Sequence, residues 1–259
     1  MNQKPLGKSG IKISEIGQGT WAYRDGVEPL RVGISSGATH VDTAEMYGTE
    51  GIVGNAIGDR RDEVFLATKV SPQHLHYDDV IKAAEGSLNR LNTKTIDLYM
   101  VHWPNPRVPI QETMKAMEDL VKKGKIRHIG VSNFSVEELK DAQDALSSQE
   151  IVSNQVEYNL QTRAVEDELI PFCKSQKITI VAYSPLSRGQ VSKRKDELLD
   201  KIAAKYKKTK AQIALNFLTR EENVVAIPKA DHVEHVKENC EASGWRLSDE
   251  DMKTIDEKF

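Results

Sequence analysis

The chain has 259 residues, of which 39% are hydrophobic and 29% are charged, and its formal net charge at pH 7 is −3. This balance is typical of a globular protein and gives no reason to expect a nucleic-acid or membrane partner. No apolar run approaches the ~20 residues of a membrane span, and residues 1–10 lack the apolar core of a signal peptide. Cys173 and Cys240 are the two cysteines. We interpret them as free thiols of a cytoplasmic protein and expect no metal site.

The first residues predict a β-hairpin, in which "KPL" and "IKISEIG" flank a turn at residues 7–10. Short apolar runs then alternate with longer amphipathic runs along the whole chain. Eight short runs are predicted to be strands, and several are apolar at consecutive positions, as in strands that are covered on both faces. They span residues 15–20, 39–44, 64–70, 96–102, 126–133, 152–159, 178–185 and 223–229.

Helical patterns fill the intervals between these strands. Residues 78–91 and 110–123 each place apolar side chains on one stripe. Residues 135–139 begin with a serine that is followed three positions later by glutamate, which is the signature of a capping box. Two helices are expected between the last two strands, at 193–206 and 209–220. A final helix with its own capping box is expected at 248–258.

Eight β-then-α units in about 250 residues predict an α/β protein with a (β/α)8 TIM barrel. An open, doubly wound sheet is the alternative, but about six strands would be more usual there. No linker or break in composition divides the chain, so we expect one domain that spans residues 1–259.

Ionisable side chains recur where a barrel would carry its catalytic face, at the carboxyl ends of the strands. Asp42, Lys69 and His102 end three successive strands, and Tyr47 follows in a glycine-rich loop. Each residue alone has an ordinary explanation, such as a lysine that snorkels to water. Successive strands are neighbours in a barrel, however, so the four side chains would meet in one pocket.

The chemistry of such a pocket is specific. A free tyrosine has a pKa of ~10, which is too high for proton exchange near neutrality. A Lys69 cation within hydrogen-bonding reach is expected to lower the pKa of Tyr47 by ~2–3, while Asp42 keeps that lysine charged. A neutral His102 would donate to a carbonyl oxygen. The set predicts protonation of a developing alkoxide, which forms when a nicotinamide cofactor gives hydride to an aldehyde or ketone. No G-x-G-x-x-G motif follows a strand, so the cofactor would lie extended across the barrel mouth.

Eight motifs together reveal a family resemblance. They are "GQGTW", "VDTAEMYGTEGIVG", "ATKV", "DLYMVHWP", "GKIRHIGVSNF", "NQVEYN", "VAYSPL" and "IPK…EN", in this order over almost the whole chain. With them the chain resembles the aldo-keto reductases, in a short-loop form similar to prostaglandin F synthase and 2,5-diketo-gluconate reductase. The resemblance implies a barrel whose bottom is closed by an N-terminal hairpin. It also implies NADPH-dependent reduction of small carbonyl compounds or sugars.

The resemblance assigns roles residue by residue. Tyr47 matches the proton donor, Asp42 and Lys69 match the residues that tune it, and His102 matches the residue that orients the substrate. Trp21 and Trp103 match walls of the substrate pocket. The implied cofactor-binding residues are Gly19, Thr20, Asp42, Ser132, Asn133, Gln155, Tyr183, Ser184, Leu186, Lys229, Glu238 and Asn239.

The resemblance also implies which part of the cofactor these residues contact. Ser184 and Leu186 match the turn that contacts the pyrophosphate, and Glu238 and Asn239 match positions near the adenine. Ser132, Asn133 and Gln155 match the residues that hold the nicotinamide carboxamide. Tyr183 matches the aromatic residue that stacks on the nicotinamide ring, and Lys229 matches the cation on the 2′-phosphate.

The chain departs from the family pattern around this phosphate. The family usually has a serine after "IPK" and an arginine five residues further on, and this chain has Ala230 and His235 there, with Asp231 beside them. We therefore expect a weakened preference for NADPH, with NADH as an alternative donor. Because histidine titrates near ~6.5, a protonated His235 is expected to restore phosphate affinity at acidic pH.

The short loops, and the end of the chain soon after its last helix, predict an open pocket with broad substrate tolerance. Its specificity is expected to depend on Trp21 and Trp103, together with Tyr23 and Phe134.

Two other functions fit parts of the pattern. A nucleotide-binding regulatory or structural protein of the same fold would need no chemistry. An aldolase-like barrel would form a Schiff base on Lys69, although Asp42 opposes this by keeping the amine protonated. A monomer is expected, because no exposed apolar helix face is evident.

Overall fold

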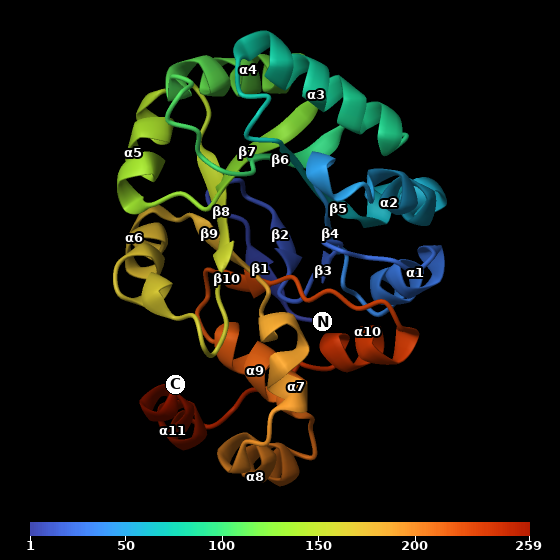
Figure 1. Ribbon diagram of the computed structural model, residues 1–259, viewed down its shortest axis with the longest axis vertical. Coiled ribbons are helices and arrows are strands. Elements are labelled where there is room, and N and C mark those ends of the chain that lie inside the picture. The colour runs from blue at the N-terminus through green and yellow to red at the C-terminus, as the bar shows by residue number, and fades with distance from the viewer.

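Eight parallel strands form the wall of a barrel in the computed structural model, which describes residues 1–259 (Figure 1). In chain order they are β3 (Gln18–Gly19), β4 (His40–Asp42), β5 (Phe65–Val70), β6 (Ile96–Val101), β7 (Ile126–Ser132), β8 (Ile151–Glu157), β9 (Thr179–Tyr183) and β10 (Val224–Ala226). Each strand pairs in parallel with the next one along the chain. A bridge between Ile16 and Ala226 closes the ring. The predicted (β/α)8 fold and its eight strands are confirmed.

The strands are buried on both faces, which explains their apolar runs. All six residues of β6 are buried. Leu98 and Met100 point into a small apolar cluster inside the barrel, which also contains Val181 and Val225. The other face of the wall packs against the surrounding helices in the larger core. Since both faces exclude water, alternation of polar and apolar residues is lost.

The predicted N-terminal hairpin is present and closes one end of the barrel. Its strands are β1 (Gln3–Pro5) and β2 (Lys12–Ser14), which pair antiparallel. Leu6 and Ile13 of this hairpin belong to the apolar cluster inside the barrel. Lys4 anchors the hairpin, because its Nζ donates to the backbone oxygens of Thr219, Glu221 and Val224 at 2.5, 2.6 and 2.8 Å.

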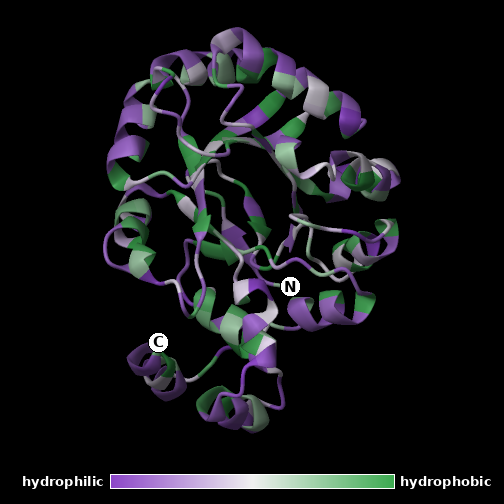
Figure 2. Ribbon diagram, in the orientation of Figure 1, coloured by the Kyte–Doolittle hydropathy of each residue, from purple (hydrophilic) through white to green (hydrophobic).

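Helices surround the strands, with purple, hydrophilic residues prominent on their outer faces in Figure 2. They are α1 (Val27–Ser35), α2 (Glu50–Ile57), α3 (Tyr77–Arg90), α4 (Ile110–Lys122), α5 (Val136–Asp144), α6 (Leu169–Gln176), α7 (Gln190–Lys193), α8 (Glu197–Tyr206), α9 (Lys210–Leu218), α10 (Val233–Cys240) and α11 (Asp249–Lys258). None of these helices is long and apolar enough to cross a membrane.

Helix boundaries follow the capping residues. The capping box before α5 is confirmed, since Ser135 Oγ accepts from Glu138 N at 3.2 Å and Glu138 Oε2 accepts from Ser135 N at 2.8 Å. The box predicted for the last helix is only half correct. Ser248 Oγ accepts from Asp251 N at 3.3 Å, but Ser248 N donates to Tyr206 Oη at 2.8 Å instead.

The helix predicted at 193–206 is divided in the structure. The short α7 ends at Lys193, and Arg194 is extended, with φ −72° and ψ 138°. A new helix, α8, begins after Asp196, whose side chain accepts from Leu199 N and caps it. The capping aspartate therefore moves the start of the helix by several residues.

Candidate active site

A cavity of about 910 Å³ opens at the carboxyl ends of the strands. Its wall includes every catalytic, cofactor-binding and substrate-binding residue that the family resemblance assigned, with one exception. Lys69 is fully buried behind the wall. The predicted residues that line the cavity are Gly19, Thr20, Trp21, Asp42, Tyr47, His102, Trp103, Ser132, Asn133, Gln155, Tyr183, Ser184, Leu186, Lys229, Glu238 and Asn239.

Lys69 and Asp42 form a buried ion pair beneath the cavity. Lys69 Nζ donates to Asp42 Oδ1 at 2.6 Å and to Thr43 O at 2.9 Å, and the two ionic side chains are 0% and 2% exposed. Gln155 Nε2 donates to the second Asp42 oxygen, Oδ2, at 2.8 Å. Burial alone would lower the pKa of Lys69, but the charges and hydrogen bonds of Asp42 and Tyr47 together outweigh burial, and the net pKa is raised. The amine is therefore held as a cation.

Tyr47 lies directly above this pair. It ends the 3₁₀ turn η1 (Glu45–Tyr47), and its ring centroid is 4.9 Å from Lys69 Nζ. The Tyr47 hydroxyl hydrogen bonds with His102 Nε2 at 3.3 Å. The convergence of Asp42, Tyr47, Lys69 and His102 that the strand order predicted is therefore present.

The predicted direction of the Tyr47 pKa is wrong for this site. Burial raises the pKa of Tyr47, and the positive charge of Lys69 offsets only part of that increase. The free energy needed to desolvate a phenolate exceeds the stabilisation that the Lys69 ammonium gives, because that ammonium is already neutralised by Asp42. The phenol is consequently protonated at neutral pH, which is the state of a proton donor.

His102 follows β6 and is neutral near pH 7. Burial, followed by the charge of Lys69, lowers its pKa to about 4. Its Nδ1 is buried without a hydrogen-bond partner, while Nε2 meets Tyr47. A neutral imidazole can use its Nε2 either to donate a hydrogen bond or to accept one. A ligand atom next to the phenol can therefore bond with both Tyr47 and His102.

A hydrogen-bonded wall extends from His102 along the next strands. Asn133 Nδ2 donates to His102 O at 3.1 Å, and Asn133 Oδ1 accepts from Tyr183 Oη at 3.1 Å. Ser132 Oγ donates to Gln155 O at 2.9 Å. Asn133 has φ 64°, a left-handed conformation that asparagine tolerates better than most residues. These bonds fix the directions of the polar groups on this wall.

The opposite end of the cavity carries an ion pair and a hydrogen-bonded histidine–carboxylate pair. Lys229 Nζ contacts the Asp231 carboxylate, and His235 Nδ1 hydrogen bonds with Glu238 Oε2 at 3.0 Å. Ala230, which also lines the cavity, has no hydroxyl group to offer. The cation expected on a 2′-phosphate is therefore already paired.

Two residues that were predicted to set specificity do not line the cavity, and an exposed residue of the lining was not predicted. Tyr23 is buried and turns away, since its hydroxyl donates to Gly26 O at 2.8 Å. Phe134 is buried in the main core. Neither residue lines the cavity. Met46 does line it and is 55% exposed. Its position directly before Tyr47, in a turn rather than a strand, was the available signal.

The two histidines that follow β5, His74 and His76, have carboxylate partners. His74 Nδ1 lies 2.8 Å from Glu45 Oε1, and His76 Nδ1 lies 3.2 Å from Glu112 Oε2. No group of three or more His, Cys, Asp or Glu side chains is arranged to hold a metal ion.

The chain matches the model of the Aldo/keto reductase family over residues 14–259. It belongs to this family. It is 36% identical to methylglyoxal reductase YeaE of Escherichia coli strain K12 over 273 residues, which cover 100% of this chain and 96% of that protein. It is also 36% identical to glyoxal reductase of Bacillus subtilis, with coverage of 96% and 90%.

Solved structures of other family members share the fold closely. The thermostable aldo-keto reductase Tm1743, in complex with epalrestat, superposes with a TM-score of 0.94 at 44% identity, covering 99% of each chain. An aldo/keto reductase from Klebsiella pneumoniae in complex with NADP and acetate gives a TM-score of 0.93 at 36% identity, covering 100% of this chain and 96% of that one.

Proposed function

We propose that this chain reduces aldehydes or ketones to alcohols with NADPH as the hydride donor. The observation that carries the proposal is the Tyr47 hydroxyl, which is protonated, hydrogen-bonded to a neutral His102 and positioned above the buried Lys69–Asp42 pair. A positioned acid beside a positioned hydrogen-bonding group is what carbonyl reduction requires.

Each residue of this group has a distinct task. Tyr47 gives its proton to the substrate oxygen as negative charge develops there, and becomes a phenolate. Lys69 stabilises that phenolate through its charge, because its Nζ lies 4.9 Å from the ring centroid. Asp42 keeps Lys69 charged and fixed in place. His102 holds the carbonyl oxygen within reach of the phenol, so the proton does not have to come from solvent.

The residues present fit a nicotinamide dinucleotide. The cavity of about 910 Å³ lies at the upper end of the ~300–1,000 Å³ range of ligand pockets, so it has room beyond a small carbonyl compound. Gln155 lines the cavity and gives its amide nitrogen to Asp42, so its amide oxygen is left for a donor such as a carboxamide. We assign Ser132, Asn133, Gln155 and Tyr183 to the nicotinamide end. Bound NADPH would supply the hydride.

Gly19, Thr20, Ser184 and Leu186 are assigned to the middle of the cofactor, and Lys229, Glu238 and Asn239 to its adenosine end. At Gly19 a side chain is excluded, since a Cβ atom there would lie 2.7 Å from Ile227 O. The backbone of β3 therefore forms the cavity wall itself, and an extended ligand can lie against it.

The substrate end favours small carbonyl compounds. Trp21 and Trp103 line the cavity and are 53% and 48% exposed, so flat apolar surfaces border a wide opening. We propose α-dicarbonyls and other small aldehydes as substrates, in keeping with the names of the methylglyoxal and glyoxal reductases described above.

We further propose that the chain acts as a single barrel domain and as a monomer in the cytoplasm. Its two thiols are free, and burial raises the pKa of Cys173 to about 12 and that of Cys240 to about 11. Such thiols are poor nucleophiles and suit a reducing compartment.

A kinetic screen of aldehydes, α-dicarbonyls and sugars tests this function, with oxidation of NADPH as the readout. Turnover of at least one class supports the proposal. Binding of NADPH by calorimetry without turnover of any compound would favour the nucleotide-binding alternative.

A further inference from the structure

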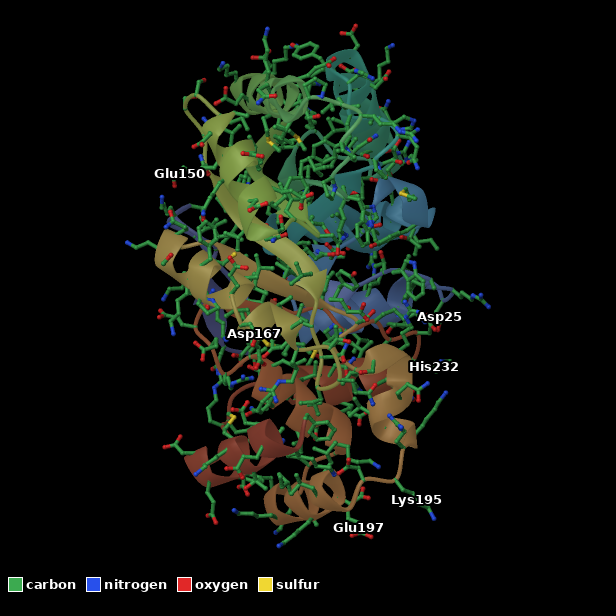
Figure 3. All side chains as sticks on the ribbon, turned by 60° about the vertical axis from the view of Figure 1, so that its left-hand side comes forward. Asp25, Glu150, Asp167, Lys195, Glu197 and His232 are labelled. Atoms are coloured by element: carbon green, nitrogen blue, oxygen red, sulfur yellow. The ribbon has the colours of Figure 1, made fainter.

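The adenosine end of the cavity contains a carboxylate that competes with a phosphate for its cation. Lys229 Nζ contacts the Asp231 carboxylate. Asp231 Oδ1 also accepts from the backbone N–H of Arg24 at 3.2 Å, which ties the loop after β3 to the segment after β10. Asp25 follows Arg24 in the sequence and His232 follows Asp231, and both labelled residues lie on the same side of the molecule in Figure 3.

Resting on the proposed function, we propose that Asp231 is a specificity-determining residue that disfavours a 2′-phosphate, so that the enzyme accepts NADH as well as NADPH. A 2′-phosphate would have to displace the carboxylate from Lys229 or lie beside it with like charge. A 2′-hydroxyl group carries no charge and can donate to a carboxylate, so NADH meets no such penalty.

The neighbouring charges strengthen this selection. His235 stands where a phosphate-binding arginine was expected, and its Nδ1 is engaged with Glu238 Oε2 at 3.0 Å. His232 is the other titratable group of this part of the wall. Burial would raise the pKa of Asp231, but Lys229 and the Arg24 N–H outweigh it, and the net pKa is lowered. Asp231 is therefore ionised whenever the enzyme works near neutral pH.

Replacement of Asp231 by Asn separates charge from anchoring. The amide oxygen of Asn can still accept from Arg24 N, whereas Asp231→Ala removes both contacts. Isothermal titration with NADP⁺ and with NAD⁺, at one fixed salt concentration, gives the ratio of the two dissociation constants. For Asp231→Asn we expect NADP⁺ to bind roughly tenfold more tightly, while NAD⁺ changes by less than about twofold.

A matched control corrects for the change in net charge. Asp62→Asn alters the charge by the same amount at an exposed position outside the cavity lining, and it should leave the ratio unchanged. Lys229→Met completes a double-mutant cycle. Because Lys229 is already paired, its loss should weaken NADP⁺ binding by less than about threefold in the wild type, but by more than about tenfold in Asp231→Asn.

The outcomes are distinguishable. An unchanged ratio in Asp231→Asn, with both dinucleotides still bound, overturns the selection by Asp231 and leaves carbonyl reduction standing. Failure of the wild type to bind either dinucleotide overturns the proposed function, and this inference with it.

Discussion

Lys69 and Asp42 make a 2.6 Å ion pair that is almost completely shielded from solvent. The pair comes from neighbouring strands, since Asp42 ends β4 and Lys69 lies in β5. A buried pair of this kind adds little stability by itself, but the loss of either partner leaves an uncompensated charge. Its position beneath Tyr47 indicates that the charge is retained for chemistry.

Lys69→Met is therefore expected to lower the free energy of unfolding by roughly 3–5 kcal/mol, because Asp42 stays buried without its partner. Carbonyl reduction should be lost as well. The double variant Lys69→Met/Asp42→Asn should regain part of the stability but none of the activity. Urea unfolding measures the first quantity and NADPH oxidation the second. A single variant as stable as the wild type would contradict the structure.

Tyr47→Phe should reduce kcat/KM for carbonyl reduction by roughly 10²–10⁴-fold, because the positioned acid is removed. Cofactor affinity should remain near that of the wild type. Tyr77→Phe is the matched control, since the Tyr77 hydroxyl donates to Asp119 at 2.8 Å and does not border the cavity. Substantial activity in Tyr47→Phe would mean that another group gives the proton.

The pH profile of kcat should show no inflection near the ordinary histidine pKa of about 6.5. Reduction needs a neutral His102 and a protonated Tyr47. The pKa of His102 is about 4 and that of Tyr47 is raised, so both keep their working states from mildly acidic to mildly alkaline pH. Activity should fall only as the pH approaches about 4, or at strongly alkaline pH. At saturating cofactor and substrate, kcat does not depend on cofactor affinity, so His232 and His235 at the adenosine end do not affect the measurement. An inflection near neutrality would show that His102 is charged in the working site.

His40 should make the fold sensitive to acid. Both of its ring nitrogens are buried without a hydrogen-bond partner, its ring packs edge-on against Phe65 at 5.5 Å, and burial lowers its pKa to about 4. Below about pH 6.5 the unfolded chain binds a proton at His40, whereas the folded chain does not. The free energy of unfolding therefore decreases as the pH falls from about 6.5 to 4.

The loss linked to His40 should amount to roughly 3 kcal/mol. His40→Leu should remove most of this pH dependence, with a much smaller change in stability at mildly alkaline pH. Urea unfolding at several pH values provides the comparison. Parallel pH curves for the two proteins would exclude His40 as the cause.

The sequence predicted the strands well and also predicted that four ionisable side chains would meet, for different physical reasons. A strand covered on both faces, such as β6, must be apolar throughout, and that leaves a strong pattern. The meeting of Asp42, Tyr47, Lys69 and His102 followed from the order of neighbouring strands alone. Asp196 could also have been identified as a cap, but the helical pattern around it hid the start of α8.

Quantities that depend on burial could not be obtained in this way. The direction of the Tyr47 pKa is a balance between desolvation and the charge of Lys69, and only the three-dimensional arrangement gives the first of these. Tyr23 illustrates the same limit for side-chain direction. Its aromatic character suited a pocket wall, yet a hydrogen bond to Gly26 O turns it into the protein.

The closure of the ring has a consequence for biosynthesis. Ala226 donates to Glu15 O and accepts from Gly17 N, and Lys4 finds its hydrogen-bond acceptors at Thr219, Glu221 and Val224. During translation, the bonds that close the ring and anchor the hairpin can therefore form only when nearly all of the polypeptide has emerged from the ribosome. Contacts so distant along the chain slow folding and leave sheet edges open to mispairing. Nascent chains that stall before residue 219 should thus be a natural substrate for chaperones.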